Sequence, residues 1–214
     1  MSRHHPVRAN ARGFTLVELL IVIGIISLLA VALLPQVREI FMESKGAQTT
    51  ARIQLLQQMI EKYQRDNGDY PVSDYALLPK SIKAKADSRN AGIECLLIQL
   101  GQKRLGGTLT FDDHPEWLKN TDEDDNTDEI PELRTRKKLE VVDAWGNPFA
   151  YFHNASYGKK QTIALGVSQE DAEAEAMKDD RGYLNPRKYQ IISAGANGTF
   201  GDDDDVCYPE RPKH

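Results

Sequence analysis

The chain has 214 residues, which is enough for one globular domain and an N-terminal segment but not for two large domains. Its net charge is −5, and no basic cluster beyond the first dozen residues points to a nucleic-acid-binding groove, so we expect no nucleic-acid partner. The two cysteines, Cys95 and Cys207, are too few for a disulfide scaffold, and their spacing leaves open whether they form one bridge.

A long apolar run, "FTLVELLIVIGIISLLAVALL", occupies residues 14–34. As a helix with about 1.5 Å of rise per residue it would measure roughly 31 Å, close to the hydrocarbon thickness of a bilayer. The run is too long for the core of a cleaved secretory signal, and no A-x-A-like site follows it. We therefore expect residues 14–34 to span the membrane once. The arginine-bearing residues 1–13 should stay in the cytoplasm, and the rest of the chain should lie on the other side.

One acid, Glu18, lies inside this run. A carboxylate at the centre of a spanning helix costs roughly 2.5–3.5 kcal/mol on insertion scales. Two explanations are open. Either Glu18 is shallow enough for its carboxylate to reach the cytoplasmic interface, or it has a function that justifies the cost.

The stretch "GFTLVELLIVIGII", which begins at Gly13, closely resembles the class III signal of type IV pilins and type II secretion pseudopilins. The resemblance implies that a membrane-embedded prepilin peptidase cuts between Gly13 and Phe14 and methylates the new N-terminal residue. In a filament, the free amine of Phe14 would pair with Glu18 of a neighbouring subunit. Pairing would offset the desolvation of the buried carboxylate, so Glu18 is interpreted as an assembly residue.

The helix is predicted to continue through residues 35–66. Pro35 should kink or loosen it. Asn67 and Gly68 form a predicted C-cap, with Pro71 just beyond. Apolar residues at three- and four-residue steps indicate an amphipathic helix with one side against a domain. The predicted face consists of Val37, Ile40, Phe41, Ala47, Ala51, Leu55, Met59 and Tyr63.

Residues 72–140 should form a long connection with local structure. "NAGIECLLIQLG" predicts a helix that ends at Gly101, with an apolar face of Ile93, Leu96, Leu97 and Leu100. "GGTLTF", residues 106–111, predicts a short strand.

The next segment, "NTDEDDNTDEIPE", is strongly acidic. Its Asp122, Asp124 and Asn126 alternate as in a calcium loop, but Thr127 and Leu133 stand where such a loop has glycine and glutamate. A solvated acidic loop is therefore favoured over a metal site.

A strand-rich region follows. "LEVVDAWGNPFAYFHN" predicts a short approach, a tight turn at residues 146–148 and a strand at 149–153, and "KYQIISAG" predicts another strand. Between them, "SQEDAEAEAMKDD" has Ser168 followed three residues later by Asp171. This capping-box pattern predicts a short polar helix on the surface.

"DAWGNPFAY" and "ISAGANGTFGDDDDV" resemble the major pseudopilin of type II secretion, in which a D-x-W-G-N-P turn precedes the sheet and a glycine-rich loop ending in aspartates binds calcium. The residues are chemically suited to this. Calcium prefers several carboxylate, amide and carbonyl oxygens, and adjacent aspartates would repel one another without a cation. The alternative is a disordered acidic tail. The implied calcium ligands are Asn197, Asp202, Asp204 and Asp205, with Asn197 in place of the usual aspartate.

No catalytic constellation is recognisable. The histidines lack zinc spacing, and no CxxC, nucleophile elbow, phosphate loop or dinucleotide fingerprint occurs. We therefore expect a structural protein and not an enzyme.

The sequence predicts an α+β chain with a type IV pilin-like fold, in which a long N-terminal helix packs on a small antiparallel sheet. Its parts are a leader at 1–13, a membrane-spanning half-helix at 14–34, an amphipathic half-helix at 35–66 and a periplasmic domain at 67–214 with insertions at 72–138 and 155–187. We expect a subunit in the bacterial inner membrane that polymerises with itself into a type II secretion pseudopilus. The expected partners are the prepilin peptidase, minor pseudopilins and the inner-membrane assembly platform. The alternatives are a surface type IV pilus subunit for adhesion, motility or DNA uptake, and a membrane-anchored enzyme or binding domain.

Overall fold

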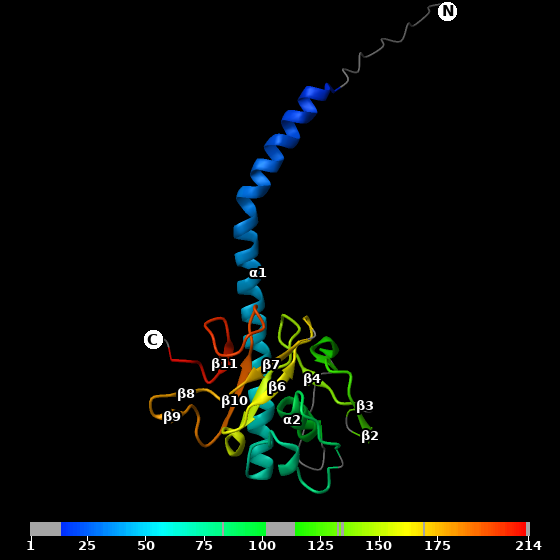
Figure 1. Ribbon diagram of the computed structural model, residues 1–214, viewed down its shortest axis with the longest axis vertical. Helices are drawn as coiled ribbons and strands as arrows, with labels where there is room; N and C mark the ends of the chain where they lie inside the picture. The colour runs from blue at the N-terminus through cyan, green and yellow to red at the C-terminus, as the bar shows by residue number, and fades with distance from the viewer. Residues whose placement is uncertain are drawn as a thin grey trace, which may run out of the picture. The chain divides into compact units, whose positions relative to one another are not determined.

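The computed structural model describes residues 14–82, 84–101, 114–131, 133, 135–168 and 170–212 (Figure 1). The chain divides into two compact units, one ending at Met42 and the other beginning at Glu43. Helix α1, Leu16–Asn67, contributes to both units and is assigned without interruption through Pro35.

The first half of α1 is apolar and exposed. Among the described residues, α1 is the helix that is long and apolar enough to cross a membrane. Its most apolar stretch has a mean hydropathy of 2.9, and none of that stretch is buried. Side chains from Phe14 to Met42 therefore present their apolar surface outward, as expected of a segment whose natural surroundings are lipid or other helices.

The second half of α1 is amphipathic, as predicted, but its buried face differs from the predicted one. Met59 and Tyr63 are buried as expected, whereas the structure exposes Val37, Ile40, Phe41, Ala47 and Ala51. The first three precede Glu43, where the second unit begins. Alanine removes little apolar area from water, so the stripe follows the larger side chains that lie on a neighbouring face. The buried residues of the helix are Thr49, Ile53, Leu56, Met59, Ile60 and Tyr63.

Helix α1 ends where the sequence predicts. The amide of Gly68 donates to the carbonyl of Gln64 at 2.8 Å, and Gly68 has φ +88°, a left-handed conformation that glycine adopts without a Cβ clash. The side chain of Asn67 also donates to the carbonyl of Tyr63 at 2.8 Å.

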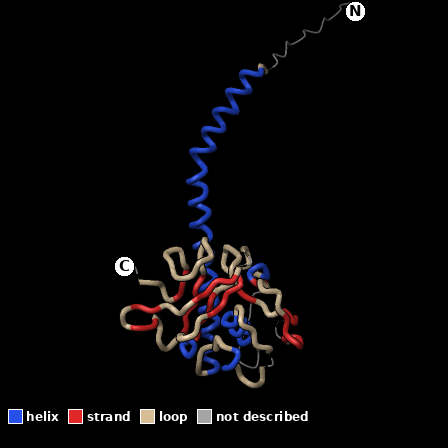
Figure 2. The backbone as a smooth tube through the Cα atoms, in the orientation of Figure 1, coloured by secondary structure: helices blue, strands red, loops and turns tan. Residues whose placement is uncertain are grey.

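The core of the second unit is a three-stranded antiparallel sheet in the order β11-β10-β5. Figure 1 labels β10 and β11, and Figure 2 draws the strands in red. Strand β5 is Ala150–His153, β10 is Tyr189–Ser193 and β11 is Val206–Tyr208. In the register, Ile191 lies opposite both Tyr151 and Tyr208. The strands at 149–153 and 188–195 are therefore confirmed.

Both faces of this sheet are covered, so β5 and β10 are buried along their whole length. Tyr151, Tyr189 and Ile191 pack with residues of α1 and α2 in one core cluster. Phe152 and Ile192, which point to the opposite face, pack with residues of β6 and β7 in a second cluster.

Helix α2, Ala91–Gly101, confirms the predicted helix. The residues directly after Gly101 lie outside the described ones, so its predicted end stays a prediction. Its residues from Gly92 onward are buried, and Gly92 lies directly against β5. A Cβ at Gly92 would come within 2.2 Å of the carbonyl oxygen of Tyr151. Cys95 on this helix is buried, and both Cys95 and Cys207 are free thiols.

The remaining strands form two-stranded antiparallel pairs, and short 3-10 helices lie between them. The pairs are β1 (Leu118–Lys119) with β4 (Glu140–Val141), β2 (Asp125–Ile130) with β3 (Thr135–Lys137), β6 (Gln161–Ala164) with β7 (Asp171–Ala174), and β8 (Lys178–Asp179) with β9 (Gly182–Tyr183). The 3-10 helices are η1 (Tyr75–Leu77), η3 (Pro115–Trp117) and η4 (Asn154–Ser156). The predicted strand at 106–111 lies outside the described residues.

The predicted polar helix at 168–180 is wrong. Residues Asp171–Ala174 form strand β7, which pairs with β6 in the register Thr162↔Glu173. The segment "DAEAEA" alternates acidic and small apolar residues, and this period of two suits a strand with one covered face. Ala174 is fully buried there, so tertiary packing overrides the capping-box signal.

Candidate functional site

The processing and assembly residues lie at the start of α1. Phe14 is 74% exposed, and Gly13 lies outside the described residues. Thr15 caps the helix. Its amide and its Oγ1 donate to Oε2 of Glu18 at 2.9 and 2.7 Å, while the amide of Glu18 donates to Oγ1 of Thr15 at 3.2 Å. These contacts form a capping box, which the T-x-x-E pattern could have revealed in the sequence.

The capping box gives the carboxylate of Glu18 a partner within its own chain. In the isolated subunit its carboxylate already accepts two hydrogen bonds from Thr15, so it is not a bare charge within an apolar helix. Because Glu18 and the surrounding apolar side chains are exposed, the carboxylate remains accessible to a cationic partner from another subunit.

The D-x-W-G-N-P turn positions the second predicted site, the loop between β10 and β11. Oδ1 of Asp143 accepts hydrogen bonds from the amides of Trp145 and Asn147, both at 2.9 Å. Oδ2 of Asp143 accepts one from Ser193 Oγ at 2.6 Å, at the end of β10. Arg52 of α1 donates to the carbonyl of Asp143 at 2.7 Å. One buried carboxylate thus joins the turn and the last residue before the loop, and burial raises its pKa.

Three of the four predicted calcium ligands come together in this loop. Nδ2 of Asn197 donates to Oδ2 of Asp202 at 2.7 Å and to Oδ1 of Asp204 at 2.8 Å. The amides of Ala196 and Asn197 donate to Oδ2 of Asp204 at 2.8 and 3.1 Å. Gly195, with φ +59°, allows this wrapping, because a Cβ there would come within 2.2 Å of the carbonyl oxygen of Asp204.

The carboxylate of the fourth predicted ligand, Asp205, bonds to Gly201 and Arg211. Its Oδ2 accepts hydrogen bonds from Gly201 N at 2.9 Å and from Arg211 Nη2 at 2.6 Å. Its Oδ1 is buried without a hydrogen-bond partner among the described residues, and burial raises the pKa of Asp205 to about 6. The donor set of the loop consists of oxygens, which suits a hard cation, and the orphaned oxygen of Asp205 is compatible with one.

The expectation of a solvated loop at residues 120–132 is wrong in two respects. Residues 125–130 form strand β2, and the carboxylate oxygens of Asp122 and Asp124 are buried. Asn126 does not join them, because its side chain bonds to the backbone of Lys85 and Asp128. The three residues therefore do not form the calcium loop that their spacing resembles.

Comparison with known proteins identifies the N-terminal segment and the family. A family model for the prokaryotic N-terminal methylation motif matches residues 8–34, which contain Gly13, Phe14 and Glu18. The chain is 33% identical over 109 residues to the type IV wide pilus major component PilA4 of Thermus thermophilus, covering 48% of this chain and 80% of that protein. This chain belongs to the type IV pilin-like family.

A second pilin-like relative extends the similarity. Over 160 residues the chain is 25% identical to the type II secretion system core protein G of Pseudomonas aeruginosa, covering 75% of this chain and 86% of that protein. No solved structure matches the chain.

These relatives confirm the predicted family and its α+β pilin-like fold. They are structural subunits, so this pilin-like chain is a structural subunit and not an enzyme. The methylation motif and the apolar first half of α1 make it a single-pass, membrane-anchored protein.

Proposed function

We propose that this protein is a pseudopilin that polymerises into the periplasmic pseudopilus of a type II secretion system. The observation that carries the proposal is the match to core protein G. The aligned region of 160 residues is much longer than the 52 residues of α1, so the similarity includes much of the globular unit. Residues 1–13 would face the cytoplasm and the domain the periplasm, as the arginine-bearing leader favours. Minor pseudopilins and the inner-membrane assembly platform would be its partners.

Assembly would use the exposed apolar half of α1. After cleavage at Gly13, the amine of Phe14 would approach Glu18 of a neighbouring subunit as the helices pack side by side. The capping hydrogen bonds from Thr15 fix Glu18 at the first turn of the helix. A misregistered neighbour would bury the carboxylate against apolar side chains without its amine partner, and this cost would select one register.

A surface type IV pilus subunit is the second candidate. The 33% identity to the wide pilus major component favours it, although that match covers 48% of this chain. Deleting the gene distinguishes the two candidates, and complementation with the wild-type chain is the control that should restore the lost function. If the protein is a pseudopilin, the deletion should make exported proteins accumulate in the periplasm while surface filaments remain. Loss of surface filaments with normal secretion would instead establish the pilus subunit.

Processing gives a direct prediction. Intact-mass analysis of the membrane-extracted protein should show a chain that begins with N-methylated Phe14. Gly13→Ala should be processed far better than Gly13→Leu, because the resemblance implies a small residue before the cleaved bond. A mature wild-type chain that still begins at Met1 would contradict the assignment of Gly13 and Phe14.

We also propose that Asn197, Asp202, Asp204 and Asp205 hold calcium. The cation would neutralise the aspartate run and fasten the β10–β11 connection. Rotation of the Asn197 amide would present its oxygen in place of the nitrogen that now bonds Asp202 and Asp204.

Calcium should therefore stabilise the folded protein. At a hundredfold excess over the dissociation constant, a ligand that binds only the folded state adds about 2.7 kcal/mol. Asp204→Asn should reduce the calcium-dependent rise in melting temperature, whereas Asp203→Asn should not, because the Asp203 side chain is exposed. Magnesium should stabilise less, since it demands a tighter octahedral site. Equal calcium responses of the two variants would refute the loop as the site.

A further inference from the structure

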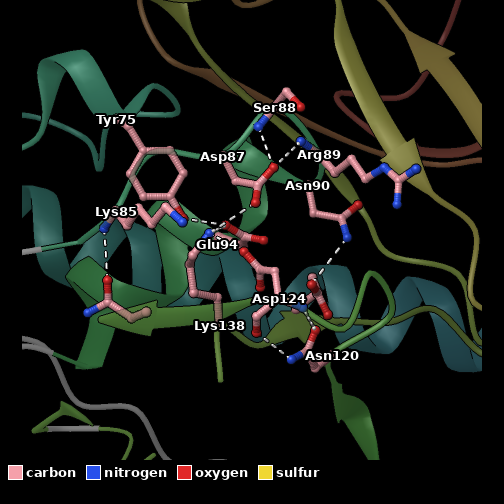
Figure 3. A network of polar contacts seen from close by, with 12 residues as sticks. Tyr75, Lys85, Asp87, Ser88, Arg89, Asn90, Glu94, Asn120, Asp124 and Lys138 are labelled. Carbon is pink, nitrogen blue, oxygen red and sulfur yellow. Dashed lines mark hydrogen bonds and ion pairs between the residues drawn. The ribbon is translucent and has the colours of Figure 1, made fainter. Parts of the chain in front are cut away.

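A separate group of carboxylates lies in the globular unit, on elements that the C-terminal loop does not use. Figure 3 labels its members Glu94 and Asp124, together with Lys138. The group consists of Glu94 from α2, Asp122 and Asp124 from the connection between β1 and β2, and Glu140 from β4. One oxygen from each lies within 4.8 Å of the others. We call these four residues the α2–β4 cluster.

Several oxygens of this cluster are buried and have no hydrogen-bond partner within the part of the chain that the structure describes. Glu94 is fully buried, and its Oε2 accepts a hydrogen bond from the hydroxyl of Tyr75. Its Oε1 has no hydrogen-bond partner among the described residues, and the same holds for both carboxylate oxygens of Asp122. Buried acceptors are costly when they are left unsatisfied, so these oxygens indicate a missing electropositive partner.

Glu140 is held in position by its surroundings. It is fully buried, its Oε1 accepts a hydrogen bond from Nδ2 of Asn90 at 3.1 Å, and its Oε2 accepts one from the amide of Thr121 at 3.0 Å. Asn90 is itself fixed, because its Oδ1 accepts from the amide of Ala164 at 2.9 Å. Contacts of this kind orient the carboxylates that ligate metals in proteins.

The ammonium group of Lys138 lies among these carboxylates and forms ion pairs with them. Nζ of Lys138 contacts Asp124 and lies 3.4 Å from Glu94 and 3.5 Å from Asp87. Its single charge does not balance these carboxylates together with Asp122 and Glu140.

We propose that the α2–β4 cluster binds a hard divalent cation of the size of calcium. All four donors are carboxylate oxygens, which favours calcium over zinc, whose usual ligands include nitrogen and sulfur. A mutual spacing of up to 4.8 Å also fits, because two ligands on opposite sides of a calcium ion, each about 2.4 Å away, are about 4.8 Å apart. The ion would tie the segment from β1 to β4 onto α2 and share the carboxylates with Lys138.

Calcium binding by the full-length chain in detergent tests this site separately from the C-terminal loop. The Asp204→Asn variant should retain calcium binding, measured by calorimetry. Adding Asp122→Asn to it should weaken the remaining affinity by about tenfold or more, because one carboxylate ligand is lost. Adding Asp125→Asn instead is the matched control. It removes the same charge from an exposed neighbour and should leave the affinity unchanged.

The calcium affinity of Lys138→Met is a second test, because removing a purely structural ion pair would not change that affinity. Removing the competing ammonium should tighten calcium binding in the Asp204→Asn background by about tenfold and make the variant's stability depend on calcium. Hydrogen exchange should then slow with calcium in residues 91–101 and 118–141.

The outcomes separate the two metal sites. Calcium binding that disappears with Asp204→Asn alone would overturn the α2–β4 site and leave the loop site standing. Binding that survives Asp204→Asn but is unaffected by Asp122→Asn and Lys138→Met would also overturn it. Calcium binding lost with Asp122→Asn alone, and intact in Asp204→Asn, would support the cluster and refute the loop.

Discussion

Glu18→Gln is expected to abolish filament assembly while leaving membrane insertion intact. Glutamine preserves the acceptor oxygen that caps the helix with Thr15, so the start of α1 should be unchanged. The substitution removes the negative charge that would pair with the amine of Phe14 in a neighbouring subunit. Insertion should not suffer, because a neutral side chain costs less in the bilayer than a carboxylate.

Chemical crosslinking of neighbouring subunits in cells measures the result. We expect the ladder of crosslinked multimers to be lost in Glu18→Gln and kept in the control Thr15→Ala, which removes the hydroxyl of the cap but retains the charge. If Glu18→Gln gave the wild-type ladder and Thr15→Ala did not, capping and not charge pairing would be the role of Glu18.

Ile60→Ala should lower the free energy of unfolding by about 2–5 kcal/mol, the usual cost of removing a large aliphatic side chain from a well-packed core. Ile60 is fully buried on α1 and belongs to the same core cluster as Leu96, Tyr151 and Ile191. A cavity at Ile60 would therefore lie where helices α1 and α2 meet the central sheet.

Denaturant unfolding of the full-length protein in detergent, followed by tryptophan fluorescence, measures this effect. Ile60→Val should cost about 0.5–1.5 kcal/mol, since it removes one methylene. Gln54→Ala, at an exposed position of the same helix, should change the stability by less than about 0.5 kcal/mol. Similar losses for Ile60→Ala and Gln54→Ala would show that this part of α1 does not pack in the core.

Local signals determined several elements. The length and hydropathy of residues 14–34 predicted the apolar helix, because a spanning segment must satisfy its backbone internally and expose apolar side chains. The end of α1 at Asn67 and the turn before β5 were readable because glycine and proline act through their own backbone conformations. The capping box at Thr15 is equally local, because it depends only on the T-x-x-E pattern.

Only the tertiary structure decided which face of α1 is buried and what "DAEAEA" forms. The helix face depends on the larger apolar side chains that the sheet and α2 cover, and β7 exists because β6 lies beside it. The α2–β4 cluster depends entirely on packing. Glu94, Asp122 and Glu140 are far apart in the chain. No rule of sequence spacing predicts that a residue of α2 lies beside the first residue of β4. Their convergence follows from the way α2, β1 and β4 pack against one another, which periodicity along a single segment does not encode.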